Sequence, residues 1–510
     1  MIRPVALLGL VVGAVLAGAG LATAAAPSPR GPGALAVSEV PVRETVVACP
    51  GLRSRAGYTD SSVAAGTPPQ TGSAEGTGGT GGTAVVRTLT EDPGKSRPRI
   101  ILRTPGASGV YTGRNGERDS LVGRAVDAMA PGFTVTQTER TVDGGHRGLA
   151  TTACLPSGSD FWFVGAGTRV GQQSVLVLTN PEASVATVDV GVYGRRGRFD
   201  SPSGTGITVP ARSRVEVSVP RLAPGQEVLA LHVEVRSGRL SAAVTETDVN
   251  GFEPRGTDWI PATVEPDRAL VVPGVPAVAK DRLSKVTLDV AAPRSDATVS
   301  VKLVTPDGTF VPVGGGEMDV RGGTVRQLDL TNALRSQPAA LLVTSDAPVV
   351  AGAKVLLKRP SYFGDSMYLA ATASLRAAAV VPDNITTANL ATRLILSAPA
   401  TEVTVQVLTY DANGKERTTD VTVSAGTTKA LEVLPPSVAP GTPVTGQRYR
   451  RFGMVITPQS GSGALYAVRM QDEEGSRGPL VSALPLLAAR LQVPVYPAAP
   501  TVLAGVYPTF

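Results

Sequence analysis

Three stretches of the chain repeat one pattern of two apolar strands joined by a short polar turn and followed by a glycine turn. The stretches are SVLVLTNPEASVATVDVGVYGRRGRF (174–199), KVTLDVAAPRSDATVSVKLVTPDGTF (285–310) and TRLILSAPATEVTVQVLTYDANGKE (392–416). Gly197 and Gly308 lie 111 residues apart, and Gly308 and Gly414 lie 106 apart. This period exceeds the roughly 20–50 residues of solenoid repeats, so the units are expected to be whole domains in tandem.

The second halves of the repeats also read as strand, polar turn and strand, over 229–244, 340–355 and 452–468. Val188, Val190 and Val192 alternate with polar or small residues, which is typical of a half-buried strand. The chain's 57 glycines and 42 prolines disfavour long helices. We therefore predict an all-β protein of tandem, Ig-like β-sandwich modules, with one short helix within 120–130.

The first 30 residues predict export. A basic start at Arg3 is followed by an uncharged apolar run and a small-residue Ala22-Thr23-Ala24 motif, as in a signal peptide. The run is also long enough for a membrane anchor, so residues 1–26 are expected to be either, with membrane contact through 4–29 if uncleaved. The rest of the chain is then extracytoplasmic, either secreted or anchored to the cell membrane by the N-terminus.

The predicted domains follow the export segment. They are an N-terminal β region at 27–160 with a Gly/Thr-rich linker at 64–84, and β-sandwich repeats at 161–276, 277–384 and 385–510. Strands are expected at 42–49, 85–89, 100–102, 133–140 and 149–154. These form either a fourth, smaller domain or an extension of the first repeat. Proline-rich joints at 272–276 and 381–383 predict an extended, semi-rigid row of modules.

The chain has two cysteines, Cys49 and Cys154. A lone pair in an exported chain predicts one disulfide bond, which would close a loop of about 105 residues and clamp segments on either side of the Gly/Thr-rich linker. Each cysteine ends an alternating apolar segment. We therefore expect the bond to join neighbouring strands of one sheet or two packed sheets.

Catalytic and cofactor signatures are weak. The two histidines, His146 and His232, read as a loop residue and a solvent-facing strand residue, and neither GxSxG nor SxxK occurs. The glycine-rich stretch 165–171 lacks the following helix that a phosphate loop needs. Residues 411–414 read as a turn, and Asp472-Glu473-Glu474 as a solvated turn. We expect no enzyme activity, no cofactor and no metal site.

Two basic clusters are the candidate anion-binding residues: Arg195, Arg196 and Arg198, and Arg448, Arg450 and Arg451. The net charge of +6 gives only a weak field over so large a surface. The partner is unknown. Envelope glycans, anionic wall polymers and envelope proteins are candidates, whereas few aromatic residues lie near the basic clusters, which argues against nucleic acid.

The sequence resembles an exported actinobacterial family classed as a domain of unknown function, number 5719. The features shared with it are Cys49-Pro50, the Gly/Thr-rich linker, Cys154 shortly before Phe161-Trp162-Phe163, and the Leu-Thr-Asn-Pro turn at 178–181. The third repeat departs from this pattern. The resemblance implies export and β-modules and transfers no site residues. We expect a non-catalytic envelope protein acting as a structural or binding module. The alternative is a carbohydrate-active envelope enzyme whose carboxylates come together only in the fold.

Overall fold

The computed structural model describes residues 38–51, 59–69, 81–113, 119–279, 281–313 and 316–495, and nearly all of its regular structure is β-strand. The chain divides into a large unit, Val42–Leu491, and a small one built from the two chain ends. In the small unit β1 (Ser38–Pro41) pairs antiparallel with β35 (Gln492–Val495). The predicted export segment, 1–26, lies outside the described residues, as does most of the Gly/Thr-rich linker. In the described part, no helix is long and apolar enough to cross a membrane.

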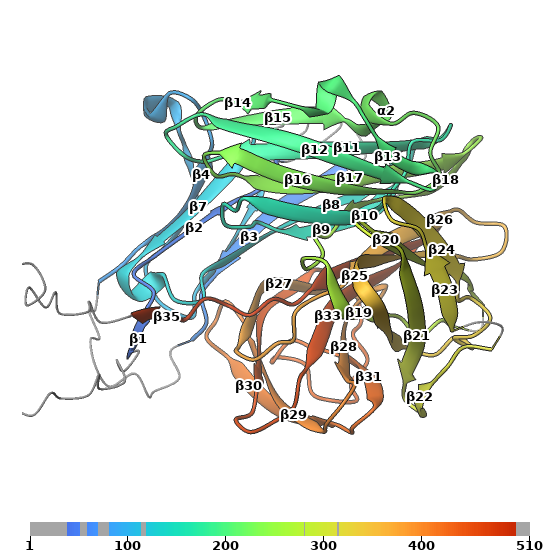
Figure 1. Ribbon diagram of the computed structural model, residues 1–510. Coiled ribbons are helices and arrows are strands. Elements are labelled where there is room, and N and C mark those ends of the chain that lie inside the picture. The colour runs from blue at the N-terminus through green and yellow to red at the C-terminus, as the bar shows by residue number, and fades with distance from the viewer. Residues whose placement is uncertain are drawn as a thin grey trace, which may run out of the picture. The chain divides into compact units, whose positions relative to one another are not determined.

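The large unit contains four β-sandwiches in succession, coloured from blue to orange in Figure 1. The first sandwich pairs two four-stranded sheets around a core that includes Leu121, Val86 and Val135. One sheet has the order β2 (Glu44–Ala48), β7 (Leu121–Val126), β4 (Ala84–Thr88) and β5 (Pro98–Leu102). The other has the order β6 (Ser108–Thr112), β3 (Thr59–Gly66), β8 (Thr134–Thr141) and β9 (Gly148–Ala153). Two 3₁₀ turns, η1 (Pro93–Lys95) and η2 (Asp127–Met129), connect strands.

The short helix predicted within 120–130 is confirmed only as the single 3₁₀ turn η2, because a strand takes up the rest of this range. Residues 121–126 form β7, in which Leu121, Gly123 and Ala125 are buried and alternate with more exposed neighbours. This period of two places three small or apolar residues on the core face of a sheet, whereas a helix would scatter them.

The second sandwich contains most of the first predicted repeat, 161–276, but the last strand in that range, β19 (Asp267–Val275), belongs to the third sandwich. One sheet has the order β15 (Ser213–Ser218), β11 (Gln172–Asn180), β17 (Ser241–Asn250) and β18 (Glu253–Ile260). The other has β10 (Asp160–Ala166), β16 (Leu229–Ser237) and β12 (Ala186–Gly194), with β13 (Gly197–Phe199) and β14 (Ile207–Val209) beside β12. Short helical turns are η3 (Pro202–Gly204) and α2 (Val219–Leu222).

The third sandwich is organised by one 20-residue strand, β25 (Ala339–Lys358), which belongs to both of its sheets. Its first part pairs with β19 (Asp267–Val275) and β21 (Ala297–Thr305), and β21 also pairs with β22 (Gly308–Phe310) and β23 (Glu317–Val320). Its second part lies between β20 (Leu283–Ala292) and β26 (Gly364–Ala370), and β24 (Thr324–Asp329) pairs with β20.

The fourth sandwich also has two four-stranded sheets. One has the order β31 (Thr427–Glu432), β28 (Leu390–Ala398), β33 (Tyr466–Gly475) and β34 (Gly478–Pro485). The other has the order β27 (Ala379–Thr386), β32 (Arg450–Pro458), β29 (Val403–Tyr410) and β30 (Glu416–Val423).

All four sandwiches share one strand order. Each sandwich has eight strand positions if β13 and β14 count as one, β22 and β23 count as one, and the two parts of β25 count as two. Numbered along the chain, these positions give the sheet orders 1-6-3-4 and 5-2-7-8 in every sandwich. The predicted tandem β-sandwich fold is confirmed, and the N-terminal region is a fourth copy of the same topology. The expected hairpins close at Gly197, Gly308 and Gly414, where β12 meets β13, β21 meets β22 and β29 meets β30.

The eighth strands of the sandwiches, β9, β18, β26 and β34, are called the axial strands below. β9 contacts β18, β18 contacts β26, β26 contacts β34, and β34 contacts β9, so the contacts between sandwiches close on themselves. The first and last parts of the large unit also meet directly, since Gly132 N donates to Arg490 O at 3.0 Å. The predicted extended row of modules is therefore wrong.

Two local features explain why the modules pack together. Residues 272–276 and 381–383, expected to be stiff joints, fall largely within β19 and β27, and a register shift in each strand accommodates the prolines. The axial strands approach closely through glycine. A Cβ on Gly148 would lie 2.3 Å from Thr257 O, and one on Gly256 would lie 2.3 Å from Ser366 N.

The predicted disulfide bond is confirmed. Cys49 and Cys154 are bonded with their Cα atoms 4.3 Å apart, and both are buried in the core of the first sandwich. Cys49 follows β2 and Cys154 follows β9, which belong to different sheets. The bond therefore ties the two packed sheets together rather than two strands of one sheet.

Candidate functional site

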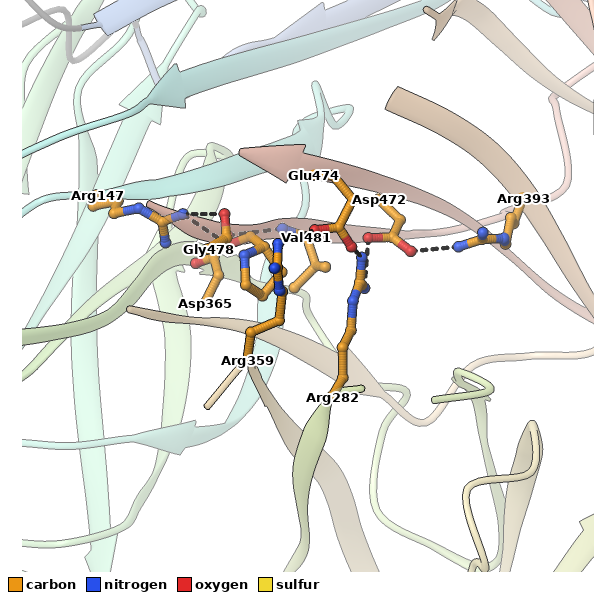
Figure 2. Close-up of polar contacts among 10 residues, drawn as sticks. Arg147, Arg282, Arg359, Asp365, Arg393, Asp472, Glu474, Gly478 and Val481 are labelled. Atoms are coloured by element: carbon orange, nitrogen blue, oxygen red, sulfur yellow. Dashed lines mark hydrogen bonds and ion pairs between the residues drawn. The ribbon is translucent and has the colours of Figure 1, made fainter. Parts of the chain in front are cut away.

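A buried guanidinium lies where the four sandwiches meet. Arg147 ends the turn between β8 and β9, and its side chain is almost fully buried. It donates to Gly364 O and to Pro479 O, each at 3.0 Å. It also donates to Gly478 O at 2.6 Å (Figure 2). Burial lowers the pKa of Arg147, and the nearby carboxylate of Asp365 opposes that shift. One side chain of the first sandwich thus binds carbonyl groups of the third and the fourth.

Two fully buried carboxylates on axial strands receive hydrogen bonds from neighbouring sandwiches. Asp365 Oδ2 accepts from Leu149 N at 3.1 Å and from Val481 N at 2.8 Å. Asp258 Oδ1 accepts from Thr151 N at 3.2 Å and from Ser482 Oγ at 3.2 Å. Burial raises the pKa of Asp365 to about 8 and raises that of Asp258 as well, while these donors lower both.

A chain of ion pairs extends outward from this centre along the end of β33 (Figure 2). Arg282 pairs with Asp472 at 2.8 Å and with Glu474. Arg393 pairs with Asp472, and Arg359 pairs with Glu474 at 3.4 Å. Burial lowers the pKa of Arg282, but the two carboxylates outweigh it and the net shift is upward. The network joins the third sandwich to the fourth.

The middle residue of the same acidic run points to another sandwich. Glu473 accepts from Arg140 Nε at 2.6 Å and from Arg140 Nη2 at 2.5 Å, a two-point contact between the fourth and first sandwiches. The hydrogen bond to Glu473 raises the pKa of Arg140. Asp472-Glu473-Glu474 is therefore not the solvated turn expected from sequence, because the run lies in β33 and each of its carboxylates pairs with at least one arginine.

A cavity of about 660 Å³ lies beside this network, between the third and fourth sandwiches. Arg282, Arg393, Asp472 and Glu474 line it together with Glu432 and a wall of apolar residues. Its charged groups and its size make it a candidate binding site. No group of three or more His, Cys, Asp or Glu in the described ranges has the arrangement of a metal site.

A model of the family described as "Family of unknown function (DUF5719)" matches residues 110–434, which is more than half of the chain. The chain belongs to this family. No curated protein matches this DUF5719 member. A solved structure, titled as the tetra-tandem repeat in the extending region of a large adhesion protein, is 13% identical, with 82% of this chain and 92% of that chain covered. Its TM-score of 0.08 carries no structural argument.

The first predicted arginine cluster of this DUF5719 protein lies at the hairpin between β12 and β13, in the second sandwich. Arg195 and Arg196 are exposed in the turn, and Arg195 Nη1 lies 3.0 Å from Glu227 Oε2. The Arg198 guanidinium lies 5.8 Å from the centre of the Tyr193 ring.

The second predicted cluster lies at the start of β32, in the fourth sandwich. Arg448 and Arg450 are exposed, whereas Arg451 pairs with the buried Asp383 at 2.5 Å. No contact found among the described residues joins the two clusters, and neither contributes to the cavity. Their anion-binding role stays a prediction.

Both histidines contact other side chains, whereas the sequence predicted one in a loop and one facing solvent on a strand. His232 Nε2 lies 2.8 Å from Asp160 Oδ2, and its ring stacks on Trp162 with centroids 4.0 Å apart. His146 Nδ1 lies 3.3 Å from Thr247 Oγ1 in the neighbouring sandwich.

The residues that sequence reasoning missed are Arg147, Asp258, Asp365 and Arg282. They lie in a turn, in strands or in a loop, and none of them belongs to a motif. The sequence signal that could have found two of them is their position just after a glycine. Asp258 and Asp365 each lie within two residues after a glycine that begins or interrupts an axial strand, Gly256 and Gly364.

Proposed function

We propose that this DUF5719 protein is a non-catalytic, exported cell-envelope protein whose four-sandwich unit serves as a rigid structural or binding module. The observation that carries the proposal is the state of its buried carboxylates. Asp258 and Asp365 accept backbone N–H groups, and the 472–474 carboxylates each bind a guanidinium. A general acid or nucleophile needs a carboxyl group that is free to react with its substrate, whereas these groups are bound by backbone N–H groups or by arginines that join the sandwiches.

Export is part of the proposal. The Cys49–Cys154 disulfide suits an oxidising compartment, and the apolar N-terminal run suits secretion or anchoring. A reporter enzyme that works only outside the cytoplasm, fused after residue 160, is expected to be active. Activity of a cytoplasm-only reporter at the same site would contradict export.

The alternative is a carbohydrate-active envelope enzyme. Its favouring observation is that Asp472 and Glu474 line the cavity between the third and fourth sandwiches. The non-catalytic proposal expects no reducing ends to be released when the purified protein is incubated with cell-wall polysaccharide, and recovery of an envelope glycan, anionic polymer or protein in a pull-down. Release of reducing ends that Glu474→Gln abolishes would favour the enzyme.

A further inference from the structure

We infer that the cavity between the third and fourth sandwiches is a binding site for a neutral saccharide. This inference rests on the proposed binding function and names the ligand class. The cavity is lined by residues 276–279, Arg282, the 387–390 turn and β28. Its volume of about 660 Å³ falls within the roughly 300–1,000 Å³ of small-molecule sites.

The floor of the cavity is a built polar site. The side chains of Arg282 and Asp472 are only 7% and 8% exposed. Although Arg282 pairs with two carboxylates through its terminal nitrogens, its buried Nε has no partner. The ion pairs hold Arg282 and Asp472 in place, so a ligand in the cavity meets polar groups that are already positioned.

The charges on the lining exclude a strongly charged ligand. Two guanidinium groups, of Arg282 and Arg393, face three carboxylates, of Asp472, Glu474 and Glu432. This near balance attracts neither a polyanion nor a polycation. A sugar hydroxyl donates and accepts at once, so it can bridge a carboxylate and a neighbouring guanidinium without adding charge.

The remaining wall is aliphatic and matches the other face of a sugar ring. Val278, Ile395, Met470, Pro443 and Val444 line the cavity. Their methyl and methylene groups can cover the C–H face of a pyranose while its hydroxyls reach the charged floor. Apolar walls with a few placed polar groups are typical of small-molecule sites.

The test uses the purified protein on an array of neutral oligosaccharides, followed by isothermal titration of the sugars that bind, with polyphosphate as the anionic probe. Ala279→Trp places an indole at the exposed rim of the cavity without removing an ion pair. Ala183→Trp, in the exposed turn between β11 and β12, is the matched control. Glu432→Gln removes one carboxylate while keeping its size, so it tests the site even if the tryptophan variant misfolds.

We expect at least one neutral oligosaccharide to bind, Ala279→Trp to abolish binding, Ala183→Trp to preserve it, and Glu432→Gln to weaken it about tenfold. Three results would overturn the inference. The protein could bind polyphosphate in preference to sugars, it could bind no sugar on the array, or both cavity variants could bind sugar as the wild type does. Cleavage of a bound sugar by the wild-type protein would instead overturn the non-catalytic proposal and leave the saccharide site standing.

Discussion

Buried arginines in this protein differ sharply in the partners they have. Arg147 donates to three carbonyl oxygens, whereas Arg469, on β33, is fully buried and none of its guanidinium nitrogens has a partner. Arg469 lies opposite Leu394 and Leu484, so its side chain faces the core of the fourth sandwich. Burial lowers the pKa of Arg469 to about 10.

Replacing this unpartnered charge should stabilise the protein. We expect Arg469→Met to raise the free energy of unfolding by about 1–4 kcal/mol, because methionine fills similar space and removes a desolvated cation. Chemical denaturation of both proteins measures the difference. Arg282→Met is the control that should lose stability, since it leaves Asp472 buried with one guanidinium fewer. A destabilised Arg469→Met would contradict the prediction.

Buried acids should make the protein less stable as the pH rises. Burial raises the pKa of Glu246 and of Asp289 to about 7, above the values of these groups in an unfolded chain. Between about pH 4.5 and 7 the folded state then holds protons that the unfolded state has lost, so the stability falls as the pH increases.

Glu246→Gln tests this at one residue. Because the amide does not ionise, the variant should not show the part of the stability loss between pH 4.5 and 7 that comes from Glu246, about 3 kcal/mol. The melting temperature of the variant should therefore vary less with pH than that of the wild type. Melting curves across this range measure the slope. Glu234→Gln, on a more exposed site of β16, is expected to leave the slope unchanged. Equal slopes for Glu246→Gln and the wild type would count against a protonated Glu246.

At the scale of strands, the axial glycines set how closely the sandwiches approach. Gly256 has φ +127° and Gly308 has φ +117°, so both disfavour a side chain to a similar degree. Only at Gly256 would a Cβ meet backbone of the next sandwich, while at Gly308 it would meet open space.

The two glycines form a matched pair for mutation. Gly256→Ala should cost about 1–3 kcal/mol more than Gly308→Ala, because the shared backbone strain cancels and the clash between β18 and β26 remains. Urea denaturation of the two variants gives this difference. Equal losses of unfolding free energy in the two variants would mean that the second and third sandwiches move apart around the added methyl group with no loss of stability.

The disulfide acts on the two sheets of the first sandwich. Changing both Cys49 and Cys154 to Ser should lower the free energy of unfolding by about 2–5 kcal/mol, because the unfolded chain gains the freedom of a long open loop. Thermal melts of the double variant and of the reduced wild type should agree. A melt of the variant identical to that of the oxidised protein would rule out a stabilising role.

At the scale of the whole large unit, the four sandwiches depend on one another. The core of the third sandwich includes Val468, Met470 and Val481 of the fourth. The first sandwich loses partners of Arg140 and Arg147 if the fourth is removed. The sandwiches therefore share core residues and buried polar contacts with their neighbours, and we do not expect the predicted domains to fold independently.

A fragment of residues 42–372, which lacks the fourth sandwich, tests whether the other three sandwiches depend on their contacts with the fourth. It should lose near-ultraviolet circular dichroism and a cooperative melt, because buried charges would face water or remain unpaired. The matched fragment is 42–491, the complete large unit. Cooperative melting of both fragments at the same temperature would show that the closing contacts contribute little.

The β class, the repeat, the hairpins and the disulfide could all be read from the sequence, because each depends on local patterns. Alternating residues define a strand, a glycine closes a turn, and two cysteines leave one pairing. The closure of the four sandwiches and the network around the cavity could not. Arg147 finds its partners 217 and 331 residues further along the chain, and no local pattern encodes such distances. The acidic run at 472–474 reads as a solvated turn in the sequence. Only the fold brings four arginines to it, from two strands and two loops: Arg140, Arg282, Arg359 and Arg393.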